Sequence, residues 1–214
     1  MFNFWRLLAD GTHVFAVLLL LYSIRSSKSV AGISLKAQLL QLIVFMLRYW
    51  DLAWNWMSVY LILFKIFYLG ITVYTIYLIA FKYKASYQQA NDRMPVLYMI
   101  LPCILVGVIF APRKTPFVIS WSISLCLESV AILPQIYQTW RTRVVDNLHG
   151  NYVASLGVYR LFYLINWWYR NRVESVRTPS IVWITALIQT ALYSDFLWYW
   201  VKSKVTNKKL VLPQ

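Results

Sequence analysis

Seven long runs of apolar residues follow one another along the chain, and the short connections between them hold most of the charged side chains. The runs cover residues 5–24, 37–57, 59–81, 95–111, 117–139, 151–169 and 181–201. Most come close to the roughly 20 residues that a helix needs to cross a bilayer. Because a spanning segment must satisfy its own backbone hydrogen bonds, the pattern predicts an all-α integral membrane protein with seven transmembrane helices. We expect one membrane domain over residues 1–214, with a cytosolic tail at 202–214.

The composition agrees with this pattern and argues against a soluble helical protein. Hydrophobic residues make up 60% of the 214 residues and charged residues 13%, and the mean hydropathy is +0.56. A soluble domain would carry about a quarter charged residues. The start of the chain lacks a basic region and a small-residue cleavage site, so we expect a retained first helix and not a cleaved signal.

The basic residues divide unevenly between the two sides of the predicted bundle. With the N-terminus on the non-cytosolic side, twelve basic residues face the cytosol and six the opposite side. The cytosolic group is Arg25, Lys28, Lys36, Lys82, Lys84, Arg93, Arg141, Arg143, Lys202, Lys204, Lys208 and Lys209, and the opposite group is Arg6, Arg113, Lys114, Arg170, Arg172 and Arg177. The excess predicts a cytosolic C-terminus. It also accounts for most of the net charge of +14, so no nucleic-acid partner is expected.

A weak internal repeat relates the second and sixth runs. "RYWDLAWNW" at 48–56 aligns with "RLFYLINWW" at 160–168, sharing Arg and Leu at the first and fifth places and a Trp-rich end. These positions predict two parallel three-helix units joined by a linker helix, as in small sugar transporters.

Polar side chains inside the runs fall on single helical faces. One face holds Arg6, Asp10 and His13, a second Arg48, Asp51 and Asn55, a third Arg160, Tyr163, Trp167 and Arg170, and a fourth Trp121 and Glu128. Ionisable residues cost about 2.5–3.5 kcal/mol at the bilayer centre, so such faces are expected to line a wet cavity. The alternative is internal ion pairs, such as Arg48 with Asp51. The arginines outnumber the nearby acids, which favours an anionic ligand because guanidinium groups bind carboxylates in bidentate fashion.

Three residues, His13, Glu128 and Tyr159, have candidate roles in pH sensing. A histidine beside a carboxylate can change its charge between about pH 5 and 8, and His13 fits that role, with helix packing as the alternative. Glu128, if buried, is expected to be protonated or hydrogen-bonded, and Tyr159 is a candidate partner.

Enzyme chemistry is not expected. Cys103 and Cys126 lie within apolar runs, without the spacing of a disulfide framework or a metal site, and we expect both to be buried packing residues. The runs contain no paired carboxylates, metal cluster or nucleophile–base pair. We therefore predict no catalytic residues, no metal and no cofactor.

Several stretches together resemble the endoplasmic reticulum (ER) lumenal protein-retaining receptors, which recognise retrieval signals of the Lys-Asp-Glu-Leu type. The matching stretches are "AGIS" (31–34), "RYWDL" (48–52), "LESVAILPQ" (127–135), "GVYR" (157–160), "NWWYR" (166–170), "LIQTALYSDF" (187–196) and "KKLVLP" (208–213). The resemblance covers the chain from end to end. "LPQ" at 133–135 is also similar to the Pro-Gln loop transporters, to which the family is structurally related.

The resemblance implies a function, a fold and a location. Such receptors bind the C-terminal tetrapeptide of escaped lumenal proteins in the mildly acidic Golgi. They return in coat-protein-complex-I vesicles and release their cargo at the neutral pH of the ER. The implied fold is seven helices in two three-helix repeats with a lumenal N-terminus, the same orientation that the charge bias predicts.

The resemblance also implies roles for individual residues. Arg6, Arg48 and Arg160 would hold the signal's carboxylates and Arg170 its aspartate. The other pocket residues would be Tyr49, Asp51, Asn55, Trp121, Tyr163 and Trp167. His13 would sense pH, with Glu128 and Tyr159 as its hydrogen-bonded lock. Asp195 matches an aspartate needed for return transport, and Lys202, Lys204, Lys208 and Lys209 resemble the coat-binding tail.

Two departures from the family pattern bear on specificity. Val118 stands where the family usually has a glutamate that meets the signal's first residue, a Lys or His. Valine cannot pair with a cation, so we expect a preference for a signal whose first residue is not basic. The loop 171–179 is more basic than usual and carries an insertion, with Arg177 and Thr178 where the family often has an aspartate.

A rival interpretation is a transporter of a small solute, either a sugar or an amino acid, because the same fold supports both functions. The arginine surplus and the lysine tail argue against a neutral sugar.

Overall fold

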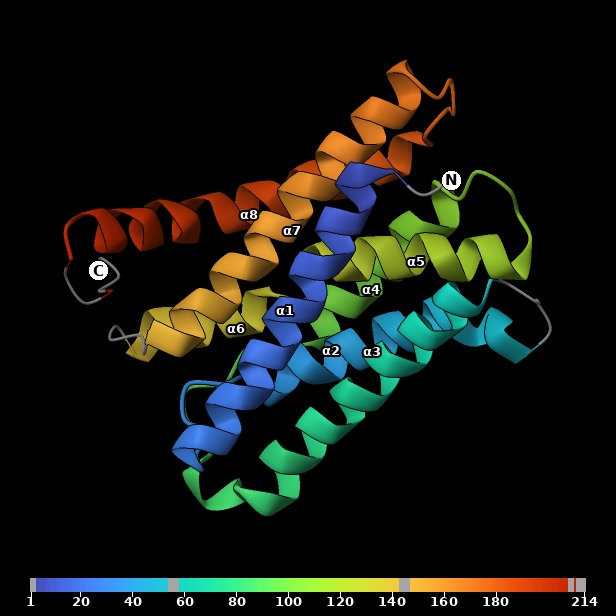
Figure 1. Cartoon of the computed structure of the whole chain (residues 1–214). Coiled ribbons are helices and arrows are strands. Elements are labelled where there is room, and N and C mark those ends of the chain that lie inside the picture. The colour runs from blue at the N-terminus through green and yellow to red at the C-terminus, as the bar shows by residue number, and fades with distance from the viewer. Residues whose placement is uncertain (1–2, 54–57, 143–146, 208–209, 211–214) are drawn as a thin grey trace.

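The computed structural model describes residues 3–53, 58–142, 147–207 and 210, and this part of the chain folds into one bundle of α-helices (Figure 1). The helices are α1 (Phe4–Ser27), α2 (Leu35–Tyr49), α3 (Val59–Tyr77), α4 (Leu97–Ile109), α5 (Pro116–Val130), α6 (Leu133–Thr142), α7 (Asn147–Arg172) and α8 (Ser180–Val205). Four stretches are long and apolar enough to cross a membrane, namely Phe4–Ser27, Val59–Lys82, Pro116–Thr142 and Ser180–Val205, and Leu97–Ile109 is a shorter apolar helix. The predicted all-helical membrane class is confirmed.

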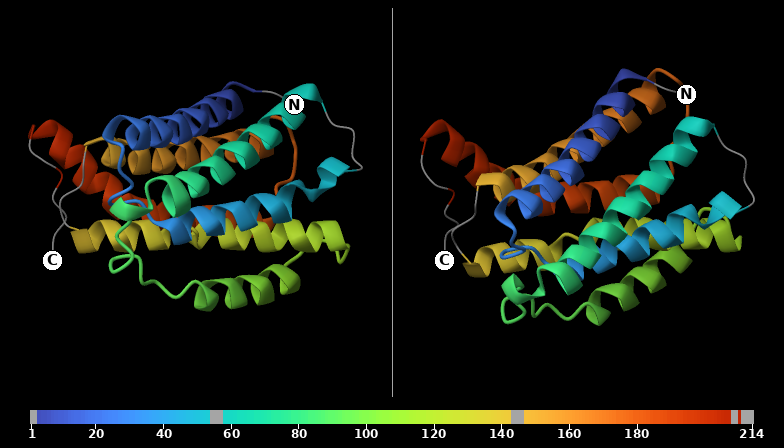
Figure 2. Two further views of the ribbon diagram at one scale, coloured as in Figure 1. Left: turned by 90° about the horizontal axis from the view of Figure 1, so that it is seen from below. Right: turned by 60° about the horizontal axis from the view of Figure 1, so that its bottom comes forward.

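The fifth predicted run forms two helices. Helix α5 ends at Val130 and α6 begins at Leu133, with Ala131 and Ile132 between them. Pro134 lies in the first turn of α6, where its missing N–H removes no intrahelical hydrogen bond. Figure 2 shows α5 and α6 following one another along one side of the bundle, so together they occupy the place of a single span.

The predicted continuous helix over 37–57 is wrong at residues 50–53. Helix α2 ends at Tyr49, and a short 3-10 turn at Trp50–Ala53 follows. Arg48 and Asp51 therefore do not share one face of a regular α-helix, as their spacing had predicted. Asn55, the third member of that face, lies outside the described residues.

The helices pack around two groups of buried apolar side chains. One group includes Ile24, Val153 and Phe196, and joins α1, α7 and α8. The other includes Leu40 and Leu127, and joins α2 to α5. Helix α1 runs along α7, and α2 and α4 each pack on α5. The start of α1 and the end of α8 lie at opposite ends of the bundle (Figure 2), as the predicted odd number of spans would require.

Helix α4 approaches α5 closely enough to require glycine. A Cβ atom added at Gly107 would lie 2.6 Å from the Cα of Ile123. The opposite side of α4 exposes apolar side chains, including Leu97, Tyr98 and Leu105, as expected of a surface that faces lipid. Cys103 and Cys126 are both buried and free, which confirms the prediction made for them.

The quoted stretches "AGIS" and "LPQ" meet at the end of the bundle where α2 begins. The backbone N–H of Ser34 donates to Oε1 of Gln135 at 2.9 Å. The Ser34 hydroxyl donates to the buried carboxylate of Asp92 at 2.9 Å, and the Tyr87 hydroxyl donates to the same carboxylate at 2.7 Å. Burial and this hydrogen bond raise the pKa of Tyr87 above its ordinary value. These hydrogen bonds connect the start of α2, the start of α6 and the segment before α4.

Candidate functional site: an arginine-lined cavity

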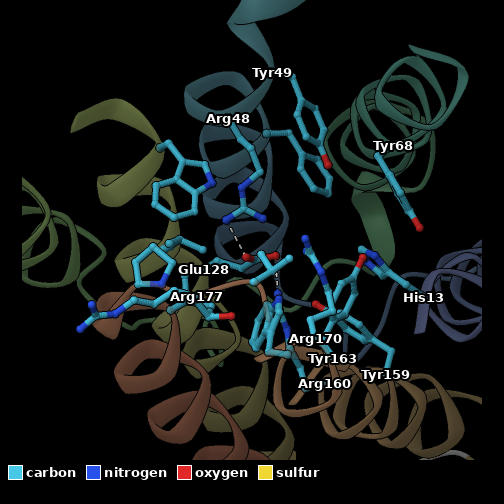
Figure 3. A pocket seen from close by; sticks show the side chains of 18 residues that line it. His13, Arg48, Tyr49, Tyr68, Glu128, Tyr159, Arg160, Tyr163, Arg170 and Arg177 are labelled. Atoms are coloured by element: carbon cyan, nitrogen blue, oxygen red, sulfur yellow. Dashed lines mark ion pairs between the residues drawn. The ribbon is translucent and has the colours of Figure 1, made fainter. Parts of the chain in front are cut away.

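A cavity of about 330 Å³ opens among α1, α2, α3, α5, α7 and the segment before α8. Its polar and aromatic lining includes His13, Arg48, Tyr49, Tyr68, Trp121, Glu128, Tyr159, Arg160, Tyr163, Trp167, Arg170 and Arg177. Figure 3 shows these side chains gathered around one carboxylate, that of Glu128. The lining thus carries four arginines and one glutamate, so the cavity has a surplus of positive charge.

Glu128 forms the centre of this cavity. Its residue is only 5% exposed. Nη2 of Arg48 lies 2.7 Å from Oε2 of Glu128, and Nη2 of Arg160 forms an ion pair with Oε1. One carboxylate from α5 therefore joins arginines from α2 and α7. The alternative of an Arg48–Asp51 pair is wrong, because Arg48 is directed to Glu128 and to the Ser124 hydroxyl, 3.1 Å from its Nε.

His13 lies between two tyrosine rings. Its imidazole stacks on Tyr159 with ring centroids 4.3 Å apart, and on Tyr68 with centroids 4.5 Å apart. The Arg160 guanidinium also lies over the Tyr159 ring, 4.6 Å from its centroid. Glu128 takes its ion pairs from the two arginines, so the Glu128–Tyr159 lock stays a prediction. The Tyr159 ring nevertheless links the imidazole to one of the guanidinium groups that hold Glu128.

A second cavity of about 380 Å³ adjoins the first. The two share Arg48, Tyr49, Tyr68, Trp121 and Tyr163 as lining residues. Arg6, Asp10, Asp51, Lys65 and Val118 line only the second. The candidate binding residues in the described part of the chain therefore all line one cavity or the other.

Asp10 and Asp51, the two acids that line the second cavity, already have partners within the protein. Nζ of Lys65 lies 2.7 Å from Oδ1 of Asp51. Asp10 accepts hydrogen bonds from the hydroxyls of Tyr163 and Tyr60, the latter at 3.1 Å. Lys65 is one of the ionisable residues inside the predicted apolar runs, but no site role was predicted for it. An intramembrane lysine usually faces a cavity or a partner, and Lys65 has both.

Glu174 is a second residue that sequence reasoning missed. Its Oε2 lies 3.4 Å from Nε of Arg170, and its Oε1 accepts a hydrogen bond from Nδ2 of Asn3 at 3.1 Å. Asn3 also caps α1, because its Oδ1 accepts from the backbone N–H of Arg6 at 2.9 Å. Glu174 therefore ties the start of α1 to the end of α7 beside the cavity.

The residues predicted to act in transport lie away from both cavities. Asp195 is exposed on α8, and Lys202 and Lys204 are exposed in its last turn. Lys208 and Lys209 lie outside the described residues. Within the described ranges no three His, Cys, Asp or Glu side chains are grouped as a metal site would need.

Comparisons with known proteins agree on one family. The sequence model of the family described as "ER lumen protein retaining receptor" matches residues 29–170. The chain is 42% identical to the ER lumen protein-retaining receptor of Entamoeba histolytica over 212 residues, which cover 99% of each chain. It is also 42% identical to that of Dictyostelium discoideum over 218 residues, covering 99% of this chain and 100% of the relative. It is 40% identical to ER lumen protein-retaining receptor B of Arabidopsis thaliana over 214 residues, covering 99% of each.

Proposed function

The chain belongs to the family of ER lumen protein-retaining receptors, and from this premise we propose that it binds C-terminal tetrapeptide signals of lumenal proteins in the acidic Golgi and releases them in the ER. The family is one of receptors and not of enzymes. Family membership supports a location in ER and Golgi membranes and does not favour the rival transporter of a small solute.

The observation that carries the proposal is the imbalance of charge around Glu128. Arg48 and Arg160 share that one carboxylate, and Arg170 and Arg177 line the same cavity. A peptide that ends in acidic residues offers an α-carboxylate and side-chain carboxylates, which guanidinium groups bind through two parallel hydrogen bonds. The volume of about 330 Å³ is at the lower end of the range usual for small-ligand sites. A short acidic peptide therefore complements the cavity in charge, and the cavity is large enough for part of it.

His13 is the proposed proton sensor. Charged side chains line the same cavity as His13 from three other helices, namely Arg48 on α2, Glu128 on α5 and Arg160 on α7. A proton on His13 would add a cation beside these arginines and draw Glu128 toward His13 and Tyr159. The arginines would then be available to the carboxylates of the peptide. Because proton and peptide favour the same state, each tightens the binding of the other, and the peptide binds more tightly at low pH.

The orientation and the repeats form part of the same proposal. The segment 176–179 that lines the cavity lies at the end of the bundle where α1 starts, since Glu174 bonds to Asn3. A lumenal N-terminus would therefore open the cavity to the lumen, in agreement with the charge bias. Two parallel repeats, α1–α3 and α5–α8, with α4 as the linker, are supported by paired contacts. Helix α1 packs on α7 as α5 packs on α2, and α2 contacts α3 as α7 contacts α8.

Return transport would use the opposite end of the same single membrane domain, 1–214. We propose that coat protein complex I binds the lysine-bearing tail 202–214 through Lys202, Lys204, Lys208 and Lys209, with Asp195 required for the return. The two lysines in the last turn of α8 are exposed, as docking to a cytosolic coat would require. A helix shift on peptide binding would change how this tail is presented to the coat.

Val118 is the proposed determinant of the signal's first residue. It lines the second cavity beside Phe117 and Trp121, where it offers an apolar contact and no charge. A basic first residue would lack a carboxylate partner at this position. The receptor should accept signals led by Ala or Met at least as well as those led by Lys or His.

Binding of a tetrapeptide at pH 5.5 and pH 7.4 to the purified receptor tests the proposed function. Binding at the acid pH that weakens at the neutral pH is expected. Failure to bind at both values would overturn the proposal. Uptake of a labelled sugar or amino acid into vesicles that contain the protein would favour the transporter.

A further inference from the structure

A cation without an acidic partner lies at the edge of the first cavity. Arg177 is exposed and lines the cavity together with Val176, Thr178 and Pro179. Within the part of the chain that the structure describes, the other arginines of the lining form ion pairs, with Glu128 or Glu174, and Arg177 forms none. Figure 3 shows its side chain extending away from Glu128, on the side opposite His13 and Tyr159.

The segment that presents Arg177 is held in place on the receptor. The backbone N–H of Val176 donates to the carbonyl of Arg170 at 3.1 Å. Ser175, between Glu174 and Val176, has a left-handed φ of 52°. Glu174 contacts both Arg170 and Asn3. These ties fix the backbone directly before Arg177, and Ser180 begins α8 shortly after it, so the backbone of Arg177 is held close to the cavity mouth.

A C-terminal signal must enter this mouth with its protein still attached. A cavity of about 330 Å³ cannot contain more than a few residues, so the chain directly upstream of the signal has to leave through the mouth. Val176 and Arg177 are exposed and line the cavity, so the segment 176–179 borders a mouth through which this chain would leave. This step rests on the proposed function, since it assumes that the ligand is a C-terminal peptide.

We propose that Arg177 is a specificity residue for the one or two positions immediately before the retrieval signal, where it selects acidic residues. A carboxylate at those positions would meet the unpaired guanidinium at the rim. Because the site is exposed, the gain should be modest, about two- to fivefold in affinity at low salt. It should act mainly on the association rate and fall as salt is raised.

Two peptides of equal length test the proposal. Both end in the same tetrapeptide, and the two residues before it are Asp-Glu in one and Asn-Gln in the other. Their affinities at pH 5.5 would be measured on the wild-type full-length receptor, on Arg177→Gln and on Arg172→Gln. Arg172 is a matched control, because it is an exposed arginine at the end of α7 that does not belong to the cavity lining.

The acidic peptide should bind about two- to fivefold more tightly than the neutral one to the wild type and to Arg172→Gln. The two peptides should bind equally to Arg177→Gln. A preference that persists in Arg177→Gln, that disappears equally in Arg172→Gln, or that is absent from the wild type would overturn the assignment. Failure of the wild type to bind either peptide would overturn the proposed function as well. The neutral peptide should bind Arg177→Gln and the wild type with equal affinity, which would show that this variant is folded.

Discussion

Arg48 and Arg160 meet at a single carboxylate, because each forms an ion pair with a different oxygen of Glu128. They come from α2 and α7, the two helices that align in the weak internal repeat. One negative charge thus holds two positive charges in a buried position. The arrangement joins three helices and leaves the cavity able to accept a further carboxylate.

Replacing Glu128 by Gln should strongly destabilise the protein without ligand. Two guanidinium groups would then lack their anion, and breaking a buried pair costs about 3–5 kcal/mol. We expect the unfolding temperature of the purified receptor to fall by about 5 °C or more. Glu174→Gln is the control, since the Arg170–Glu174 pair is more exposed than the Arg160–Glu128 pair. Equal unfolding temperatures for Glu128→Gln and the wild type would contradict a structural role of this ion pair.

Replacing His13 by Ala should flatten the pH dependence of peptide binding. Histidine ordinarily changes its charge near pH 6.5, and its proton is proposed to favour the peptide-binding state. In the variant, the affinity at pH 5.5 should fall toward that at pH 7.4, as measured in peptide titrations across this range. Tyr68→Phe keeps an aromatic ring beside His13 and should retain the dependence. A steep dependence that survives in His13→Ala would refute the assignment of the sensor.

Replacing Glu174 by Gln should raise the affinity for the acidic signal. The carboxylate of Glu174 lies 3.4 Å from Nε of Arg170, so it competes with the aspartate that this arginine is expected to bind. Removing the competing charge should tighten binding about two- to fivefold, the scale of a partly exposed ion pair. A peptide with Asn in place of that aspartate is the control and should show no gain. Equal gains for both peptides would exclude competition at Arg170.

Replacing Val118 by Glu should shift the preference toward signals led by Lys. The new carboxylate would face the second cavity, where a cationic first residue could pair with it. Tetrapeptides that differ only in the first residue would be compared on both proteins at pH 5.5, and the ratio of Lys-led to Ala-led affinity should rise about tenfold, the effect of 1.4 kcal/mol. A wild-type receptor that binds Lys- or His-led peptides at least tenfold more tightly than Ala- or Met-led ones would contradict the role given to Val118.

The sequence pattern was sufficient to predict the helices, but it did not predict where α2 and α5 end. The ends of α1, α3, α4 and α8 fall within a few residues of the predicted runs. The end of α2 at Tyr49 does not, because the residues that follow remain rich in aromatic side chains, with tryptophan at 50, 54 and 56. The break between α5 and α6 likewise falls within a continuous apolar run, and Pro134 was its one visible sign.

The residue types at the site were predictable, whereas their pairing was not. An intramembrane charge indicates a cavity or a partner, and this identified Arg48, Glu128 and Arg160. Helical spacing compares positions along one helix only, so it suggested Asp51, three residues after Arg48, as the partner of Arg48. The actual partner, Glu128, comes from α5, and Asp51 pairs with Lys65 of α3. Such contacts between helices depend on packing, which the order of residues in one segment does not specify.

Binding of one acidic tetrapeptide at pH 5.5, as the free acid and as the C-terminal amide, tests most directly whether the arginine-lined cavity holds a peptide's C-terminus. The amide lacks one carboxylate and keeps every side chain. Removing one partner of a desolvated charge pair costs about 2–5 kcal/mol, so we predict that the amide binds at least about thirtyfold more weakly. Equal affinities of the acid and the amide would contradict recognition of the C-terminal carboxylate by these arginines.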